Sequence, residues 1–171
     1  MKEIIEKIRK VNKKNQFLLI DEKSSIKLVK NKIELIHTEL AEATEALRTR
    51  DDDNFVEELA DVCIRIFSLI GFSSYNIEII EYMSPPFIFD HKGFDDRVVL
   101  ANIIGEIRTV VGHAKHYWEQ DMVTTAVYML GIVFHTFLLL VHDLGYDLLK
   151  VIEEKTNKNA KRGKRHGDKE F

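Results

Sequence analysis

Residues 33–70 decide the fold, and they read IELIHTELAEATEALRTRDDDNFVEELADVCIRIFSLI. Apolar side chains recur every three or four residues on both sides of the polar turn RTRDDDN. The stripe consists of Ile26, Val29, Ile33, Ile36, Leu40, Ala43 and Leu47 before the turn, and of Phe55, Leu59, Val62, Ile66 and Leu69 after it. This spacing places the side chains on one face of an α-helix. The stretch therefore predicts two long helices joined by a short turn, as in a helical bundle.

Local signals place the ends of these two helices. We expect the first from about Ser24 to Leu47. Asn54 followed by Glu57 has the spacing of a capping box, in which each side chain bonds to the backbone N–H of the other residue. The second helix is therefore predicted to open at Asn54, and its pattern fades at Gly71.

Further helices are expected on both sides of this pair. Periodic apolar positions predict helices at 2–14, 95–118, 122–143 and 147–162, and a Pro-Pro pair predicts a loop at 83–94. The predicted fold class is all-α: a helical bundle built from antiparallel helix pairs. We expect a single domain over 1–171, made of a hairpin at 24–72, a second helical pair at 95–143, and a basic C-terminal helix and tail at 147–171.

A faint internal likeness connects the two predicted helix pairs. SSYNIEII at 73–80 is similar to LGYDLLKVI at 144–152, and each segment follows an apolar helix. Glu106 takes the place that Glu39 has in the first pair, but the second pair lacks the other carboxylates. Either the chain contains a degenerate tandem duplication of a helical hairpin, or two apolar hairpins simply resemble each other.

Composition restricts the class of protein. A chain of 171 residues is long enough for one domain with a sizeable core. The net charge of −3 argues against nucleic acid as a partner, although residues 39–61 are acidic and residues 155–169 are strongly basic. Cys63 is the single cysteine and stands among apolar residues, so we expect a buried thiol rather than a disulfide or a metal ligand.

One segment is apolar enough to be considered as a membrane span. Residues 126–141 read AVYMLGIVFHTFLLLV, which is shorter than the ~20 residues that a spanning helix needs and includes His135. We therefore expect a buried central helix there. The start, MKEIIEKIRKVNKKN, carries charges throughout and lacks the apolar region of a signal peptide, so a cytoplasmic protein without a membrane partner is predicted.

Four carboxylates interrupt the apolar surfaces of the central pair. Glu39 and Glu42 lie three residues apart on the first helix, and Glu58 and Asp61 repeat that spacing on the second. Residues three apart share a helix face, and a short turn allows the two faces to meet. Single acidic pairs are common on solvated helix faces. Two pairs joined by a tight turn and flanked by apolar residues instead point to the seam between the helices.

Carboxylates in such a seam repel one another, by ~1 kcal/mol per pair in water and ~4 kcal/mol at an effective dielectric of 20 for a separation of ~4 Å. A bound cation would offset this repulsion. Ligands that are all oxygen select hard cations, and Mg²⁺ keeps waters that substrate phosphates can displace. We therefore predict that Glu39, Glu42, Glu58 and Asp61 make hairpin 24–72 a Mg²⁺ site, with Mn²⁺ as the alternative ion and room for more than one ion.

The same residues carry a family resemblance. ELAEATEAL at 39–47, followed by EELADV at 57–62, is similar to the E-x-x-E and E-x-x-D arrangement of the all-α nucleoside triphosphate pyrophosphohydrolases, and it resembles the MazG group most. The resemblance covers 33–70 and 144–167 but is weak over 75–120. It implies a helical bundle whose four carboxylates are the metal-binding and catalytic residues. Water then attacks phosphorus in a nucleoside triphosphate, and pyrophosphate leaves.

The basic C-terminal segment adds to this resemblance. EKTNKNAKRGKRHG at 154–167 resembles the K-x-x-x-N-x-x-R ending of that group through Lys155, Asn159 and Arg162. Lysine and arginine make charge-assisted contacts with phosphate oxygens, and asparagine can donate from its amide. We predict that these three residues bind the substrate phosphates, the alternative being a solubilising tail. Arg65, one turn beyond Asp61, is expected to pair with that carboxylate rather than with phosphate.

The predicted function is Mg²⁺-dependent hydrolysis of a nucleoside triphosphate to the monophosphate and pyrophosphate, in nucleotide-pool housekeeping. The alternatives are a narrower dUTP or phosphoribosyl-ATP pyrophosphohydrolase, and a non-catalytic helical interaction protein with a vestigial metal site. A di-iron bundle is disfavoured because neither carboxylate pair is Glu-x-x-His. The apolar excess on the later helices predicts a homo-oligomer, a dimer or higher.

Overall fold

The regular structure of the described residues is α-helical, as the apolar stripes predict. A computed structural model describes the chain except for residues 16, 18, 22–23, 73, 84–96 and 162–171. Seven helices lie in the described part: α1 Lys2–Lys14, α2 Ile26–Thr49, α3 Asp52–Ile70, α4 Ser74–Tyr82, α5 Arg97–Glu119, α6 Val123–Asp143 and α7 Leu148–Lys161. This part contains no strand, so the predicted all-α bundle is confirmed.

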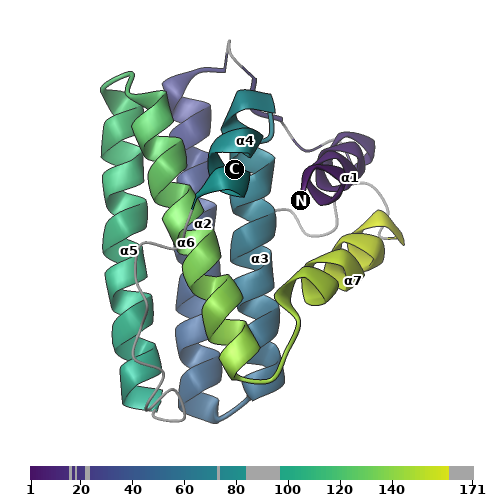
Figure 1. The fold of residues 1–171 in the computed structure, drawn as a ribbon, viewed down its shortest axis with the longest axis vertical. Coiled ribbons are helices and arrows are strands. Elements are labelled where there is room, and N and C mark those ends of the chain that lie inside the picture. Colours follow the sequence, from purple (N-terminus) through teal and green to yellow (C-terminus); the bar gives the residue numbers. More distant parts are fainter. Residues whose placement is uncertain (16, 18, 22–23, 73, 84–96, 162–171) are drawn as a thin grey trace.

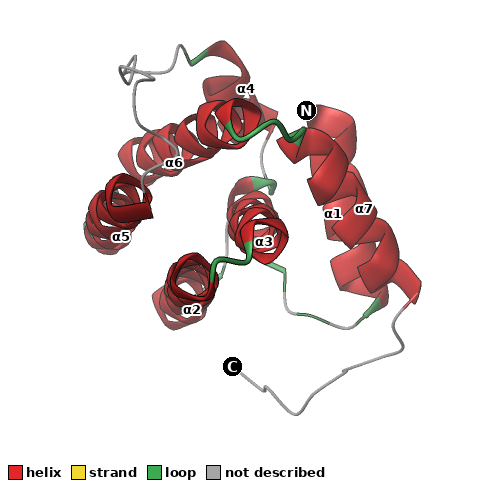
Figure 2. Cartoon of the chain, turned by 90° about the horizontal axis from the view of Figure 1, so that it is seen from below, coloured by secondary structure: helices red, strands yellow, loops and turns green. Residues whose placement is uncertain are grey.

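Four long helices form the body of the bundle. Figure 2 shows α2, α3 and α5 nearly end-on and α6 obliquely, with α3 between α2 and the shorter helices α1 and α7. The apolar stripes predicted for α2 and α3 are buried, and α5 and α6 cover one side of that pair. On the other side, α1 and α7 pack against α3 and against each other (Figure 1). The α2–α3 pair therefore lies between the α5–α6 pair and the α1–α7 pair.

The turn between α2 and α3 differs from its prediction. The helix α3 begins at Asp52, and the capping side chain is Asp51, whose Oδ1 accepts from the backbone N–H of Asn54 at 3.0 Å. The predicted capping box of Asn54 with Glu57 is therefore wrong. A carboxylate at the N-cap suits a helix start, because it accepts from a free N–H and faces the positive end of the helix dipole. The Asp-Asp-Asp run offers this cap three residues earlier than the asparagine.

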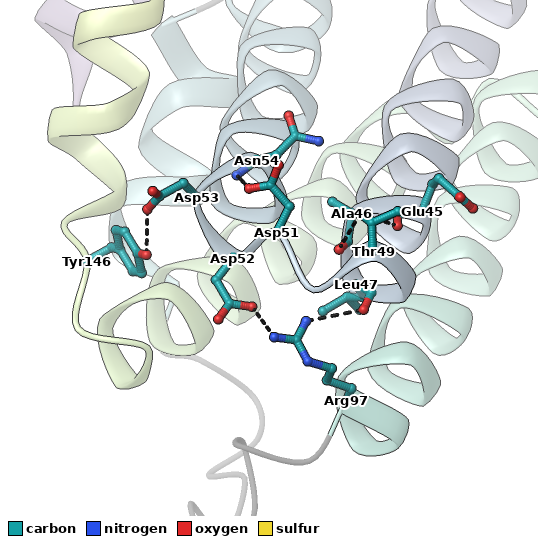
Figure 3. A network of polar contacts seen from close by, with 10 residues as sticks. All are labelled: Glu45, Ala46, Leu47, Thr49, Asp51, Asp52, Asp53, Asn54, Arg97 and Tyr146. Carbon is teal, nitrogen blue, oxygen red and sulfur yellow. Dashed lines mark hydrogen bonds and ion pairs between the residues drawn. The ribbon is translucent and has the colours of Figure 1, made fainter.

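Each of the three aspartates at the turn, Asp51, Asp52 and Asp53, accepts a hydrogen bond from a different residue (Figure 3). Asp51 caps α3, while Asp52 accepts from Arg97 Nη2 of α5 at 2.7 Å. Asp53 accepts from the hydroxyl of Tyr146, just before α7, also at 2.7 Å. Arg97 in addition donates from Nη1 to the Leu47 carbonyl at the end of α2. These contacts connect the hairpin to the two elements that flank it.

α6 is the described helix that is long and apolar enough to cross a membrane by length and composition, with a mean hydropathy of 1.9 over 18 residues. More than half of that window, 56%, is nevertheless buried inside the fold, where α3, α4, α5 and α7 pack around it. The predicted buried helix at 122–143 is therefore confirmed. His135 Nε2 lies 2.8 Å from the Ile80 carbonyl oxygen, and so connects α6 to α4.

The helix α4 was not expected from the sequence pattern. It is short and packs on α6, while α7, which follows α6, packs on α3. Each short helix thus packs against a long helix of the other pair. The predicted loop at 83–94 and the expected helix start near Asp95 lie outside the described residues, apart from Met83.

Helix α1 packs closely against Gly71 at the end of α3, and a substitution there tests this packing. A Cβ there would lie 2.5 Å from Ile5 Cγ2 and 2.7 Å from the Phe67 carbonyl oxygen, so Gly71→Ala should lower the free energy of unfolding by about 1–3 kcal/mol. Gly105→Ala is the matched control: no atom lies within 4 Å of its added Cβ, and α5 should gain up to ~1 kcal/mol of helix propensity. Urea denaturation measures both, and an unchanged Gly71→Ala would contradict this packing.

Candidate functional site

Three of the four predicted carboxylates converge. One oxygen from each of Glu39, Glu58 and Asp61 lies within 4.8 Å of the others. Glu39 belongs to α2, and the other two occupy neighbouring turns of α3, so the turn between the helices brings them together. Glu39 is buried, with 8% of its surface exposed, whereas Glu58 and Asp61 are half-buried.

The fourth predicted ligand, Glu42, lies apart from this group. Glu42 is exposed, whereas Glu39, about one turn earlier on the same helix, is buried. Its charge still acts on the cluster, because it contributes to raising the pKa of both Glu39 and Glu58. The structure therefore brings together a cluster of three carboxylates, with Glu42 near enough to add negative charge.

Glu58 has the most perturbed environment in the cluster. Its Oε2 atom is buried and has no hydrogen-bond partner among the described residues. Burial raises the pKa of Glu58 to about 7, the negative charge of Asp61 and Glu39 adds to the rise, and Lys155 opposes it. A buried carboxylate oxygen without a donor is costly, and a cation or a proton is what would satisfy it.

Glu39 is held by an arginine from the neighbouring helix. Arg65 donates from Nε at 3.0 Å and from Nη2 at 2.8 Å, and both bonds reach Glu39 Oε1. Burial raises the pKa of Glu39, and the Arg65 charge opposes this rise. The sequence-based expectation was that Arg65 would pair with Asp61 one turn away. That expectation was wrong, because the seam places Glu39 within reach of the guanidinium.

Of the predicted phosphate ligands, Lys155 lies at the carboxylates. Its Nζ is 2.5 Å from Asp61 Oδ2 and 3.2 Å from Glu57 Oε2, and it donates to the Glu57 carbonyl at 3.0 Å. Burial lowers the pKa of Lys155, but the charge and hydrogen bond of Asp61, together with the charges of Glu58 and Glu57, outweigh burial, and the pKa is raised. The lysine thus neutralises the side of the cluster that Arg65 does not reach.

The other two predicted phosphate ligands have different outcomes. Asn159 lies one turn beyond Lys155 on α7, and its backbone carbonyl accepts from Asn15 Nδ2 at 3.0 Å, which connects α7 to the end of α1. Arg162 lies outside the described residues.

A cleft of about 380 Å³ opens beside the cluster, between α1, α2, α3 and α7. Its lining residues are mostly polar or charged: Asn12, Asn15, Phe17, Lys32, Glu57, Glu58, Asp61, Ile64, Arg65, Ser68, Lys155, Lys158 and Asn159. Sequence reasoning did not find the residues from α1 and its C-terminal end, or Lys32. No spacing in the sequence marks them, since they join the site only because α1 packs across α3.

The cluster fits a hard divalent cation. Three carboxylate oxygens within 4.8 Å of one another could share one Mg²⁺, and water or phosphate oxygens in the cleft would take the remaining coordination positions of the ion. The buried Oε2 of Glu58 would then have a partner. Lys155 and Arg65 balance the same charges when no ion is bound, so ion binding must displace or share these contacts.

Comparison with family models, with curated proteins and with solved structures gives no match to this chain.

Proposed function

We propose that this protein is a Mg²⁺-dependent nucleoside triphosphate pyrophosphohydrolase. The observation that carries the proposal is the convergence of Glu39, Glu58 and Asp61. Glu58 and Asp61 line a cleft that also contains cationic side chains. Carboxylates alone would suit a simple cation site. Carboxylates beside lysine, arginine and amide groups suit a cation together with a polyphosphate, because each kind of group offsets one part of the ligand's charge.

The acidic residues of the site would bind the cation, and the basic residues would bind the substrate phosphates. Glu39, Glu58 and Asp61 would hold Mg²⁺, which polarises phosphoryl oxygens and offsets the charge that develops in the transition state. Glu58 must lose its proton for this, because ligating carboxylates are ionised. A carboxyl whose pKa is about 7 does so near neutral pH.

In this proposal Lys155 exchanges one anionic partner for another when the ion and substrate bind. It contacts Asp61 in the absence of an ion, and it would turn to a substrate phosphate once a cation takes its place on the carboxylate. Lys158 and Asn159 extend the same wall of the cleft. The reaction adds water across the anhydride bond between the first and second phosphates: the hydroxyl joins the nucleoside phosphate, and pyrophosphate departs with the bridging oxygen.

The remaining parts of the proposal follow the sequence. We place the enzyme in the cytoplasm and in nucleotide-pool housekeeping, as a homo-oligomer. Tyr128 of α6 and Val99 of α5 have exposed apolar side chains, and we place the contact with a second copy of the chain on these two helices.

A panel of nucleoside triphosphates tests the function. With Mg²⁺, at least one should yield monophosphate and pyrophosphate in equal amounts, resolved by ion-exchange chromatography. EDTA should abolish turnover and Mg²⁺ or Mn²⁺ should restore it, because the carboxylates cannot bind the phosphates without a cation. dUTP and phosphoribosyl-ATP belong in the panel, since turnover of only one of them would identify the narrower enzyme.

Two results would contradict the proposal. Stepwise release of orthophosphate through a diphosphate would mean that the terminal bond is broken instead. No turnover of any nucleotide, together with Mg²⁺ binding to the three carboxylates, would leave a non-catalytic helical protein with a metal site.

A further inference from the structure

Lys32 lies within the cleft without an anionic partner. It stands two turns before Glu39 on α2 and lines the cleft together with Arg65. It makes no hydrogen bond or ion pair with any described residue. Other lysines of the bundle are paired across helices: Lys7 with Glu153, Lys30 with Glu119 and Lys115 with Glu34. Lys32 is therefore a half-buried cation whose charge no described carboxylate balances.

The neighbours of Lys32 increase the positive charge at this end of the cleft. Burial lowers the pKa of Lys32, and the nearby Arg65 charge lowers it further. Arg65 uses Nε and Nη2 on Glu39, and its Nη1 makes no hydrogen bond with any described residue. Two cations held close together in a half-buried place destabilise each other, and an anion between them would remove that cost.

Ser68 adds a neutral donor on the same helix face as Arg65. Its Oγ accepts from Asn12 Nδ2 at 2.8 Å, so its hydroxyl proton remains to be donated elsewhere, and no described group accepts it. Ser68 is largely buried, with 8% of its surface exposed, and it lines the cleft. Along α3 the cleft therefore passes from acids at Glu58 and Asp61 to donors at Arg65 and Ser68.

We propose that Lys32, Arg65 and Ser68 form an anion subsite for the pyrophosphate part of a polyphosphate. The subsite rests on the proposed function, because the cation at Glu58 and Asp61 would hold the other end of the same phosphate chain. An anion with several oxygens fits better than a single carboxylate, since an ammonium, a guanidinium edge and a hydroxyl each offer separate donors. This subsite differs from the predicted phosphate ligands on α7, which lie on another wall of the cleft.

Inorganic pyrophosphate is the ligand for the test, with binding to the full chain measured by calorimetry in the presence of Mg²⁺. Lys32→Met should weaken pyrophosphate binding about tenfold or more, the value of a hydrogen bond to a charged group. Lys32→Arg should recover part of the affinity because the charge is kept. Lys27→Met is the matched control: Lys27 is exposed on the same helix and outside the cleft, and its loss should leave binding unchanged.

Thermal melting of the same variants distinguishes a ligand role from a structural one. Lys32→Met should melt at the same temperature as the wild type or higher, because it removes an unbalanced half-buried charge. A destabilised Lys32→Met would overturn the proposal, since it would mean that the lysine has a structural partner. Pyrophosphate binding that is unchanged in Lys32→Met, or absent from the wild type, would also overturn it.

The test separates the subsite from the proposed function. If pyrophosphate binds through Lys32 but no nucleotide is hydrolysed, the subsite stands and the enzymatic proposal fails. If nucleotides are hydrolysed to pyrophosphate but Lys32→Met binds pyrophosphate as tightly as the wild type, the enzymatic proposal holds and the subsite proposal fails.

Discussion

Glu58→Gln should reduce turnover by about 100-fold or more, because losing one ionised ligand removes several kcal/mol of metal-dependent stabilisation and each 1.4 kcal/mol is tenfold. The same variant should stabilise the metal-free protein near neutral pH. An amide has almost the shape of the carboxyl but no charge, so it spares the fold the cost of an ionised group beside Asp61 and Glu39. Loss of activity with a gain in stability identifies a functional residue rather than a structural one.

The pH dependence of this gain follows from the pKa of Glu58. In the folded protein that pKa is raised from 4.5 to about 7, so between these values the folded state keeps a proton that the unfolded state has released. Stability contributed by this group therefore falls as pH rises from about 4.5 to about 7, and stays low above. The difference in unfolding free energy between Glu58→Gln and the wild type should grow across that window.

Urea denaturation in EDTA at several pH values measures this difference. Added Mg²⁺ should stabilise the wild type and have much less effect on the variant. Glu45→Gln is the control, because Glu45 is exposed on α2 and, among the described residues, its ion pair is with Arg48 at the surface. A Glu58→Gln protein that is destabilised in EDTA yet keeps normal turnover would show that the carboxyl serves the fold alone.

Lys155→Met should have the largest effect on stability in the absence of metal. The Lys155 side chain is only 14% exposed, and its ammonium contacts both Asp61 and Glu57, so its removal leaves two carboxylates beside Glu58 without their cation. Removing one member of a largely buried ion pair should cost roughly 2–4 kcal/mol. The pKa of Glu58 should rise further, because Lys155 is the cation that lowers it.

Mg²⁺ should restore much of the stability of Lys155→Met, because the ion takes over the position of the ammonium. Activity should stay reduced about 10- to 150-fold in kcat/KM, the value of a charged hydrogen bond to a substrate phosphate. Lys150→Met, exposed on the same helix, is the control for both measurements. If Mg²⁺ fails to stabilise the variant, Lys155 and the ion do not share the same carboxylates.

The convergence of Glu39, Glu58 and Asp61 could be anticipated from the sequence. The helical period of 3.6 residues determines which side chains share a helix face. The short turn between α2 and α3 makes it favourable for α3 to pack along α2. The buried stripe of each helix and the core position of Cys63, which is 0% exposed, follow from the same periodicity. These features are local, so the order of residues along the chain is enough to predict them.

Tertiary structure alone decided the rest of the site. The pattern predicts that a helix has a buried face but does not say which neighbour covers it, so neither the approach of α1 to α3 nor the cleft it creates with Lys32 could be predicted. Partner choice has the same origin: Arg65 bonds to Glu39 rather than Asp61, and Lys155 bonds to Asp61, because contacts across helices depend on their relative position. Glu42 is exposed for a related reason, since one helical turn is enough to carry a side chain from the seam between α2 and α3 to its solvent-facing edge.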